Sequence, residues 1–369
     1  MLNGIRVLDL TRVLAGPLCT MMLGDLGAHV IKVERPGTGD ETRGWGPPFD
    51  ERGESAYYLS VNRNKLSIAL DIRDQRDRAV LESLALEADV VVDNFRRGTL
   101  ERLGFEPQAL MRRNPKLVWC TITGFGGESR RPGYDFVTQA ECGWMAITGE
   151  VDGDPMKVGV ALADVLAGKD ALASILAALL ARAGTGKGRM LLISLVDSAR
   201  AALVNVAQNV MVSGEDAKRW GNAHPNLVPY QLFSASDRAL VIAVGSDAQW
   251  ASCVSALGLK DLAADRDLAT NAGRLAQRER IVKEFSSTLM TAPAAHWRAL
   301  LDAGDVPTGV VKTVREVVDE VDASALYGMP PSVGEPARFP PPRLDEHGGV
   351  IRHSGWSVFD LTFGQTDGE

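Results

Sequence analysis

A chain of 369 residues is long enough for one large or two ordinary domains, and its 45% hydrophobic and 24% charged content excludes disordered and fibrous classes. Its 40 basic and 47 acidic residues leave a formal charge of −7, which argues against a general affinity for nucleic acid or for an anionic membrane. Any anionic ligand must therefore be held by a local basic site.

The N-terminal residues enter a strand-like pattern at once, without the basic start and small-residue cleavage site of a signal peptide. No apolar run reaches the roughly 18 to 20 residues that a spanning helix needs. The cysteines Cys19, Cys120, Cys142 and Cys253 are far apart in apolar contexts and form no CxxC pair. We therefore expect a cytoplasmic protein with buried reduced thiols, no disulfide framework and no metal site.

The first half of the chain alternates β-rich and helical segments. Strands are predicted at residues 5–10, 29–33, 66–72, 90–93, 118–122 and 190–195, and helices at 17–26, 76–87, 136–147, 163–183 and 197–212. This alternation is typical of βαβ units. The sequence therefore predicts the α/β class, with a large Rossmann-like parallel sheet covered by helices on both faces, over residues 1–213.

A polar loop at residues 214–230 marks the boundary to a second, smaller α/β domain, which we place at residues 214–325. It has predicted strands at 230–233, 240–244 and 308–311 and predicted helices at 248–257, 275–290 and 294–303. From Gly328 the chain is rich in proline, and no element can be assigned there. We expect this segment, residues 326–369, to return to the large domain.

One acidic residue stands out between these elements. Asp164 follows an apolar approach and opens a long run of helix formers, so we place it at or beside the helix N-cap, where free amides favour an ionised carboxylate. Most aspartates at helix starts are simple caps. The apolar approach and the flanking Gly159 and Gly168, which permit close contact with a backbone or ligand, favour a nucleophile instead.

The first strand–helix–strand unit, residues 5–33, could suggest dinucleotide binding. Its turn, residues 11–17, lacks the G-x-G-x-x-G that admits a pyrophosphate, and the second strand ends in the basic Lys32 and Arg35 around Glu34. A nucleotide with an extra phosphate remains possible, and solvation of surface charges is the plain alternative.

Basic and planar side chains recur where predicted strands end. In a parallel sheet the loops that leave the carboxyl ends of strands line the ligand crevice. Residues in such loops that suit an adenosine phosphate are Arg35, Asn94, Phe95, Arg96 and Arg97. Each alone is an ordinary surface residue, and their recurrence at one sheet edge is what favours a ligand site.

Residues 124–127 and 131–135 follow the fifth predicted strand. Gly124, Gly126 and Gly127 admit close ligand approach, although a plain turn explains them equally well, and Asp135 is expected to cap the next helix. No G-x-S-x-G and no metal-ligand pair occurs, and the histidines are scattered. What remains is carboxylate chemistry, in which an aspartate attacks an activated acyl group to give an anhydride.

These segments together resemble the class III CoA-transferases of the formyl-CoA transferase and carnitine CoA-transferase type. The resemblance runs in order through residues 8–17, 24–28, 30–37, 39–43, 62–65, 94–95, 133–135 and the segment around Asp164. It implies that Asp164 forms an acyl-aspartyl anhydride, that CoA is a substrate and product rather than a tightly bound cofactor, and that two chains interlock as a homodimer through residues 200–230 and 310–330. The CoA-binding residues it implies are Leu14, Arg35, Lys65, Asn94, Phe95, Arg96, Arg97 and Tyr134.

A narrower resemblance points to enzymes that move CoA between dicarboxylates, of the succinyl-CoA:glutarate type. It is carried by residues 42–49, 57–62, 218–224 and 228–231. A dicarboxylate needs a second anion site, for which the candidates are Arg12, Arg43, Arg219 and His224. The glycines at 124–127 and the amides after Asp164 are candidate oxyanion donors. Gly245 lies in a reduced form of the family's glycine-rich loop, and the chain after Gly328 is shorter than in the family.

Two alternatives remain open. An α-methylacyl-CoA racemase or epimerase resembles the same fold but uses a histidine where this chain has Tyr134, and tyrosine with a pKa near 10 is a poor base at neutral pH. A non-catalytic CoA-binding protein is the other alternative, motivated by the altered C-terminal segment. The sequence therefore favours transfer of CoA from an acyl-CoA to a carboxylic acid.

Overall fold

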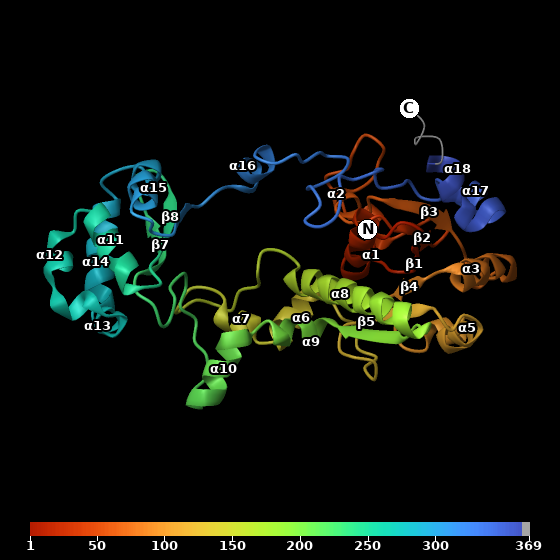
Figure 1. The fold of residues 1–369 in the computed structure, drawn as a ribbon, viewed down its shortest axis with the longest axis horizontal. Helices are drawn as coiled ribbons and strands as arrows, with labels where there is room; N and C mark the ends of the chain where they lie inside the picture. The colour runs from red at the N-terminus through yellow and green to blue at the C-terminus, as the bar shows by residue number, and fades with distance from the viewer. Residues whose placement is uncertain (364–369) are drawn as a thin grey trace. The chain divides into compact units, whose positions relative to one another are not determined.

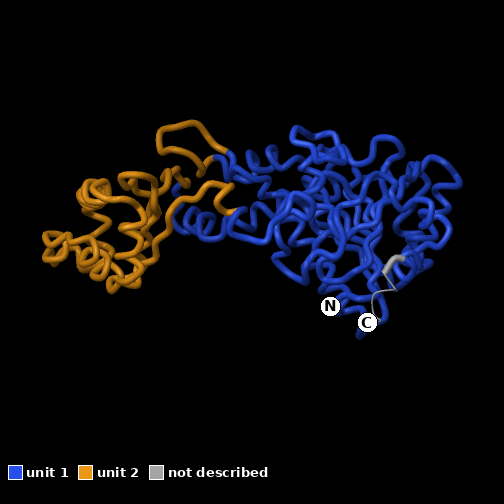
Figure 2. Tube along the Cα trace, turned by 90° about the horizontal axis from the view of Figure 1, so that it is seen from above, with its two compact units in different colours: residues 1–145, 157–215, 318–369 blue, residues 146–156, 216–317 orange. Residues whose placement is uncertain are grey.

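The computed structural model describes residues 1–363 of the chain and divides into two compact units, which Figure 2 shows in different colours. Of the described residues, the first unit contains 1–145, 157–215 and 318–363. The second contains residues 146–156 and 216–317. The short segment 146–156 thus leaves the first unit and belongs with the second, which the residue pattern did not indicate.

The first unit is built on a six-stranded sheet with the order β3-β2-β1-β4-β5-β6, in which every neighbouring pair is parallel. Its strands are β1 Arg6–Asp9, β2 His29–Glu34, β3 Lys65–Ala69, β4 Val90–Asp93, β5 Val118–Thr123 and β6 Met190–Ser194. The predicted large parallel sheet is confirmed. Because the chain order reverses between β1 and β4, a crevice is expected beyond the carboxyl ends of these two strands.

Helices cover both faces of the sheet, as Figure 1 shows. One face packs on α1 (Ala15–Asp25) and α8 (Leu162–Thr185), and the other on α3 (Gln75–Glu87) and α5 (Pro107–Arg113). The central strands are buried on both sides, which explains their nearly continuous valine and isoleucine runs.

Shorter elements complete this unit. They are η1 Glu41–Gly44, α2 Ala56–Leu59, α4 Thr99–Arg102, α6 Asp135–Glu141, α7 Trp144–Ile147, α9 Leu195–Ala201 and α10 Val204–Ser213. The single helix predicted at 136–147 is divided into α6 and α7, because Gly143 between them has a φ of 94°. The helix predicted at 197–212 is divided at Val204, where φ is 40°.

The C-terminal segment packs onto the first unit with helices that the proline-rich sequence hid. They are α17 Gly348–Ser354, η3 Gly355–Ser357 and α18 Val358–Phe363. The segment covers the edge strand β3, where the His347 amide donates to the Ser67 carbonyl at 3.0 Å and Asp345 accepts from the Ala69 amide at 2.7 Å. Residues 364–369, the end of the predicted C-terminal segment 326–369, lie outside the described range.

Trp356 anchors this segment in the core. It is 2% exposed, and its indole nitrogen donates to the Leu84 carbonyl at 3.0 Å. We expect Trp356→Ala to lower the free energy of unfolding by about 3–5 kcal/mol, because it leaves a cavity in the core under α3. Urea denaturation measures this change. The control is Leu361→Ala, because Leu361 on α18 is 64% exposed. Equal stability of the two variants would contradict the packing.

The second unit has a small antiparallel sheet, β7 Tyr230–Ser234, β8 Ala239–Ala243 and β9 Thr308–Val310, with its own core. Its helices are α11 Asp247–Ala256, α12 Lys260–Ala264, α13 Asn271–Ala276, α14 Arg278–Leu289 and α15 Ala294–Ala303, with η2 Arg266–Ala269; α16 Val314–Asp319 follows. The α/β label predicted for this domain needs refinement, because the tight turn between β7 and β8 makes the pair antiparallel rather than part of a βαβ unit.

The predictions about the cysteines and about membrane-spanning helices can be compared with this fold. Cys19, Cys120, Cys142 and Cys253 are all buried and unpaired. Within residues 1–363, the structure has no helix with the length and apolar character needed to pass through a bilayer.

Candidate active site

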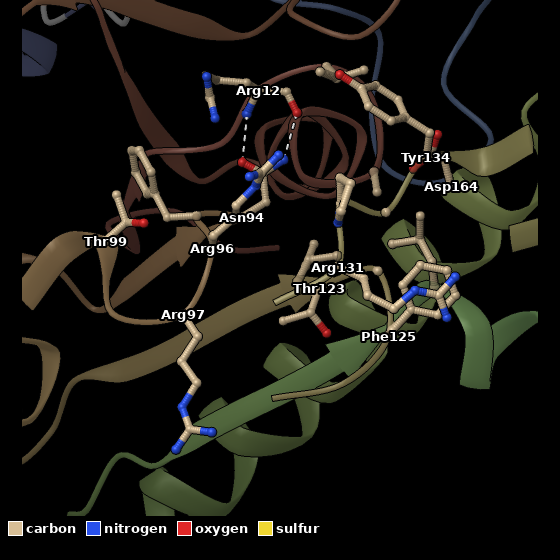
Figure 3. Close-up of a pocket in the computed structure, with 18 of the residues that line it drawn as sticks. Arg12, Asn94, Arg96, Arg97, Thr99, Thr123, Phe125, Arg131, Tyr134 and Asp164 are labelled. Carbon is tan, nitrogen blue, oxygen red and sulfur yellow. Dashed lines mark hydrogen bonds between the residues drawn. The ribbon is translucent and has the colours of Figure 1, made fainter. Parts of the chain in front are cut away.

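A cavity of about 500 Å³ lies at the switch point of the large sheet, beyond the carboxyl ends of β1, β4 and β5. Figure 3 shows it in close-up. Residues that line it include Arg12, Val13, Leu14, Arg35, Glu41, Asn94, Phe95, Arg96, Arg97, Thr123, Gly124, Phe125, Arg131, Tyr134 and Asp164. The strand-end loops singled out in the sequence thus meet at one place, together with the start of α8.

Asp164 is the third residue of α8 rather than its N-cap. The helix begins two residues earlier, at Leu162, and Ala161 takes the N-cap position without a side-chain hydrogen bond. The placement at or beside the N-cap is therefore wrong, because the apolar residues Leu162 and Ala163 already belong to the helix. The carboxylate still belongs to the first turn of the helix and reaches the cavity (Figure 3).

The surroundings of Asp164 favour its neutral form more than the helix start favours its charge. Burial, and next the negative charge of Asp135, raise the pKa of Asp164 from 3.8 to about 7. The expectation that free amides hold this carboxylate ionised is corrected accordingly. A carboxyl poised near neutrality in a cavity is typical of a functional group.

Asp135 and Gln139 on α6 fix the segment that leads into α8. Asp135 accepts from the Ala163 amide at 2.8 Å and from the Gln139 side chain at 2.7 Å. Gln139 in turn accepts from the Val158 amide at 2.8 Å and is fully buried. Asp135 was expected to cap its own helix, but Tyr134 is the N-cap of α6, and the Asp135 carboxylate satisfies the start of α8 instead. Asp164 is thereby held beside a second carboxylate.

Gly168, one turn after Asp164, sets the approach of α8 to α1. A Cβ at this position would lie 2.7 Å from the Ala15 carbonyl oxygen, so only glycine lets the two helices pack this closely. The close approach predicted for Gly168 is thus made by the backbone of Ala15, which itself lines the cavity.

The loops after β1 and β4 are joined by a reciprocal pair of hydrogen bonds, dashed in Figure 3. The Asn94 side chain accepts from the Arg12 amide at 3.1 Å and donates to the Arg12 carbonyl at 2.8 Å. The Arg12 guanidinium lies 5.5 Å from the Phe95 ring centroid and pairs with Glu41 at 2.7 Å. Its Nε is buried and has no hydrogen-bond partner within the described residues.

Further cations surround the cavity. Arg35, Arg96, Arg97 and Arg131 all line it. Arg97 pairs with Glu128 and points away from the other labelled side chains in Figure 3, whereas Arg131 stacks 4.1 Å over Phe125 and pairs with Glu141. This concentration of guanidinium groups suits an anionic ligand with several phosphates.

Of the glycines proposed as oxyanion donors, only Gly124 lines the cavity. It packs directly against the backbone of Gly133, which leaves no space for a Cβ at either position. The Gly126 amide donates to the Thr123 hydroxyl at 3.0 Å, and Gly127 lines a neighbouring cavity of about 270 Å³. The amides at the start of α8 are also engaged, since Val165 donates to the Ala161 carbonyl at 3.1 Å.

Two predicted residues of the first unit lie apart from the cavity. Lys65 starts β3 and is fully buried, where its ammonium donates to Asp9 at 3.0 Å and to the Pro17 carbonyl and Asn62 side chain at 2.9 Å. Burial is the main reason that the pKa of Lys65 falls to about 8. Arg43 forms ion pairs with Glu34 and Glu54, both at 2.7 Å, and stacks on Tyr58.

The remaining predicted residues, Arg219, His224 and Gly245, belong to the second unit. The Arg219 guanidinium donates to the carbonyls of Ala146, Glu150 and Gly153, at 2.7 to 3.3 Å, and so ties the segment 146–156 to this unit. The His224 ring accepts from the Asn226 amide at 3.0 Å. Arg219 thus fixes the segment 146–156, and His224 makes a contact within its own loop.

Several residues that line the cavity were not predicted from the sequence. Val13, Thr123, Phe125 and Arg131 line the cavity and were not named as site residues. Phe125 and Thr123 could have been found by the same strand-end rule that found Asn94, whereas nothing local distinguishes Val13. Within the described residues no cluster of three or more His, Cys, Asp or Glu side chains could hold a metal ion.

Comparisons with known proteins identify the family of the chain. A family model described as CoA-transferase family III matches residues 2–337. A succinyl-CoA:glutarate CoA-transferase of Mus musculus is 44% identical over 322 residues, which cover 86% of this chain and 74% of that protein. A succinate–glutarate CoA-transferase of Agrobacterium fabrum is 39% identical over 88% of this chain and 83% of that protein. The crystal structure of a CAIB/BAIF family protein from Brucella suis shares 39% identity with a TM-score of 0.85, covering 95% of this chain and 98% of that one. The chain belongs to CoA-transferase family III.

Proposed function

We propose that this enzyme transfers CoA from succinyl-CoA to a dicarboxylic acid acceptor, with Asp164 as the nucleophile. The observation that carries the proposal is a carboxyl with a pKa near 7 at the wall of a cavity that is otherwise rimmed by arginine. The substrates named for the mouse and Agrobacterium relatives, succinyl-CoA or succinate and glutarate, support the choice of acids.

The first half of the reaction loads the enzyme with CoA. The Asp164 carboxylate attacks the thioester carbonyl, so that a C–O bond forms, the C–S bond breaks and CoA leaves as the thiolate. The thiolate then attacks the aspartyl carbonyl of the mixed anhydride. This step forms an aspartyl-CoA thioester and releases succinate.

The second half reverses these steps with the acceptor. Its carboxylate attacks the aspartyl thioester, expelling CoA thiolate and forming a new mixed anhydride. The thiolate attacks the acceptor's acyl carbonyl, which gives the product acyl-CoA and restores the Asp164 carboxylate. Because the thiolate is needed twice, CoA must remain bound between the steps, and Arg35, Phe95 and Arg96 are the proposed handle for its nucleotide.

Arg12 is the proposed partner of the acceptor's distal carboxylate. It lines the same cavity as Asp164, and its buried Nε has no hydrogen-bond partner within the described residues. Arginine binds a carboxylate through paired N–H donors, and an unpaired buried donor would be satisfied by such a ligand. Arg219 and His224 stay proposals for the same role, with fewer free donors.

We further propose that the enzyme acts in the cytoplasm as a homodimer. Helix α10 supports the dimer, because none of its residues is buried although it carries the apolar Val204, Met211 and Val212. The buried unpaired cysteines suit a reducing compartment. Light scattering of the purified protein measures the mass and so tests the homodimer.

A panel of acyl-CoA donors and carboxylic acid acceptors, read by mass spectrometry of the CoA esters, tests the function. Succinyl-CoA with glutarate or another dicarboxylate is expected to yield the acceptor's CoA ester, with much slower transfer to monocarboxylates of equal length. Reactions without acceptor control for hydrolysis. Failure of every dicarboxylate, or equal rates with monocarboxylates, would contradict the proposal.

A further inference from the structure

The loop between β1 and α1 passes the cavity in a conformation that its own residues disfavour. Val13 has a φ of 73°, in the left-handed region that a β-branched residue adopts only at an energetic cost. Val13 lines the cavity between Arg12 and Leu14. Contacts from outside the loop must therefore stabilise this backbone.

Asp40 makes the contact at Val13. The Val13 amide donates to the Asp40 carboxylate and lies 3.3 Å from both of its oxygens. Asp40 is 1% exposed and also accepts from the Thr42 amide at 3.1 Å and the Thr42 hydroxyl at 2.8 Å. The two hydrogen bonds from Thr42 in η1 thus hold the carboxylate in the place where it accepts from the Val13 amide.

Lys32 on β2 ties this carboxylate to the same loop. Its ammonium lies 3.0 Å from Asp40 and donates to the Thr11 carbonyl at 2.8 Å, with both charged side chains fully enclosed. Burial opposes both charges, but their attraction raises the pKa of Lys32 and lowers that of Asp40, so the pair stays ionised. A buried ionic pair is weak evidence for stability, and fixing one specific conformation is a role that such pairs have in some proteins.

The neighbouring positions of the loop are held by other side chains. Asp9 accepts from the Thr11 amide at 2.9 Å, and Asn94 makes the reciprocal pair with the Arg12 backbone. Each of residues 11, 12 and 13 therefore has its own external contact. Only the contact at Val13 opposes a disfavoured dihedral angle, so its loss should release the loop.

We propose that Asp40 is a positioning residue for CoA transfer, which, paired with Lys32, holds Val13 in the left-handed conformation and thereby keeps the Arg12–Leu14 wall of the cavity in place. This inference rests on the proposed function, because it takes the cavity beside Asp164 as the place of transfer. Asp40 itself does not line that cavity and acts through the loop.

A double-mutant cycle tests the inference. Asp40→Asn keeps only one acceptor oxygen, which Thr42 already engages, and sets an NH2 donor in place of the oxygen that faces Lys32. It is therefore expected to weaken the contact at Val13 and to lower kcat/KM for dicarboxylate transfer by about 10- to 100-fold, since small misplacements of a site have effects of this size. Glycine adopts a left-handed φ without cost, so the loss caused by Asp40→Asn should be several-fold smaller when it is measured in the Val13→Gly background. A merely structural role would lower the thermal midpoint and kcat/KM equally in both backgrounds, and that result would overturn the inference.

A charge-free pair guards against a variant that does not fold. Lys32→Met with Asp40→Leu removes both buried charges and the acceptor for Val13 together, a replacement that folds tolerate well. It is expected to fold and still to lose kcat/KM. The matched control is Asp25→Asn, which breaks the buried Arg63 pair at 2.7 Å away from the cavity and should lower the thermal midpoint while kcat/KM stays at the wild-type level. Wild-type kcat/KM in the charge-free pair would overturn the inference.

The positioning role of Asp40 and the proposed function can be refuted separately. A wild-type enzyme that transfers CoA while its Asp40→Asn variant keeps full kcat/KM would refute the positioning role and leave the proposed function intact. A wild-type enzyme without activity on any dicarboxylate pair would refute the proposed function and this inference with it.

Discussion

Asp164→Asn is expected to lower CoA transfer by at least about 10³-fold, because a side-chain amide cannot form the mixed anhydride with which the reaction begins. Asparagine has the same shape as aspartate, so binding of CoA should be retained. The measurement is formation of the acceptor's CoA ester by the purified variant, followed over hours. Turnover near the wild-type rate would rule out Asp164 as the nucleophile.

The stability of the Asp164→Asn variant, compared with the wild type at different pH values, controls for its folding. Because burial and Asp135 raise the pKa of Asp164 from 3.8 to about 7, the folded chain keeps a proton that the unfolded chain releases between these values. The free energy of unfolding therefore falls as the pH rises through this window and is lowest above it. At about 1.4 kcal/mol per pK unit the penalty is on the order of a few kcal/mol.

Asparagine carries no charge, so Asp164→Asn should be more stable than the wild type at pH 8 and gain little at pH 4. Urea denaturation of both proteins at the two pH values measures the difference. A variant less stable than the wild type at pH 8 would show that the carboxyl is not held in a place that disfavours its charge.

The pH dependence of catalysis is the second large effect expected. If the free enzyme must present Asp164 as a carboxylate, kcat/KM should rise with pH up to about 7 and then level off. Below this value it should fall about tenfold per pH unit, so that about two units below, the enzyme retains about one hundredth of its activity. An acid limb near 4, the range of an ordinary aspartate, would contradict the environment described for Asp164.

Asp135→Asn separates the two causes of this shift. Removal of the neighbouring charge should move the acid limb to lower pH, but not back to the ordinary value, because burial is the larger cause. The asparagine oxygen can still accept from the Ala163 amide, which limits the structural change. An unchanged or upward-shifted limb would mean that Asp135 does not act on Asp164 through its charge.

The candidate site was predictable wherever it follows from local rules. Asn94, Phe95 and Arg35 come directly after strands, and the carboxyl ends of parallel strands meet at one edge, so their convergence needed only the βαβ pattern. Lys65, which the resemblance implies for CoA binding, follows from no such rule, and its role stays a prediction. It stands at the start of its strand and is consumed by contacts inside the core.

Features that depend on long-range contacts could not be predicted. The helix start at Leu162 places Asp164 in the first turn, where burial, and next the charge of Asp135 on another helix, raise its pKa. The hold of Asp40 on Val13 joins residues that no periodicity connects. Helix α17 was hidden because the proline-rich chain before it carries no helical pattern, and the contact of His347 with Ser67 on β3 joins residues far apart in the sequence.

The most direct test of the central claim is to trap the covalent enzyme. Wild-type protein mixed with succinyl-CoA and quenched with hydroxylamine is expected to carry an aspartyl hydroxamate on the peptide that contains Asp164, seen by mass spectrometry after digestion. The Asp164→Asn protein, treated in the same way, should carry none. Rapid transfer by the wild type with no modification of Asp164, or with the modification on another residue, would contradict the account.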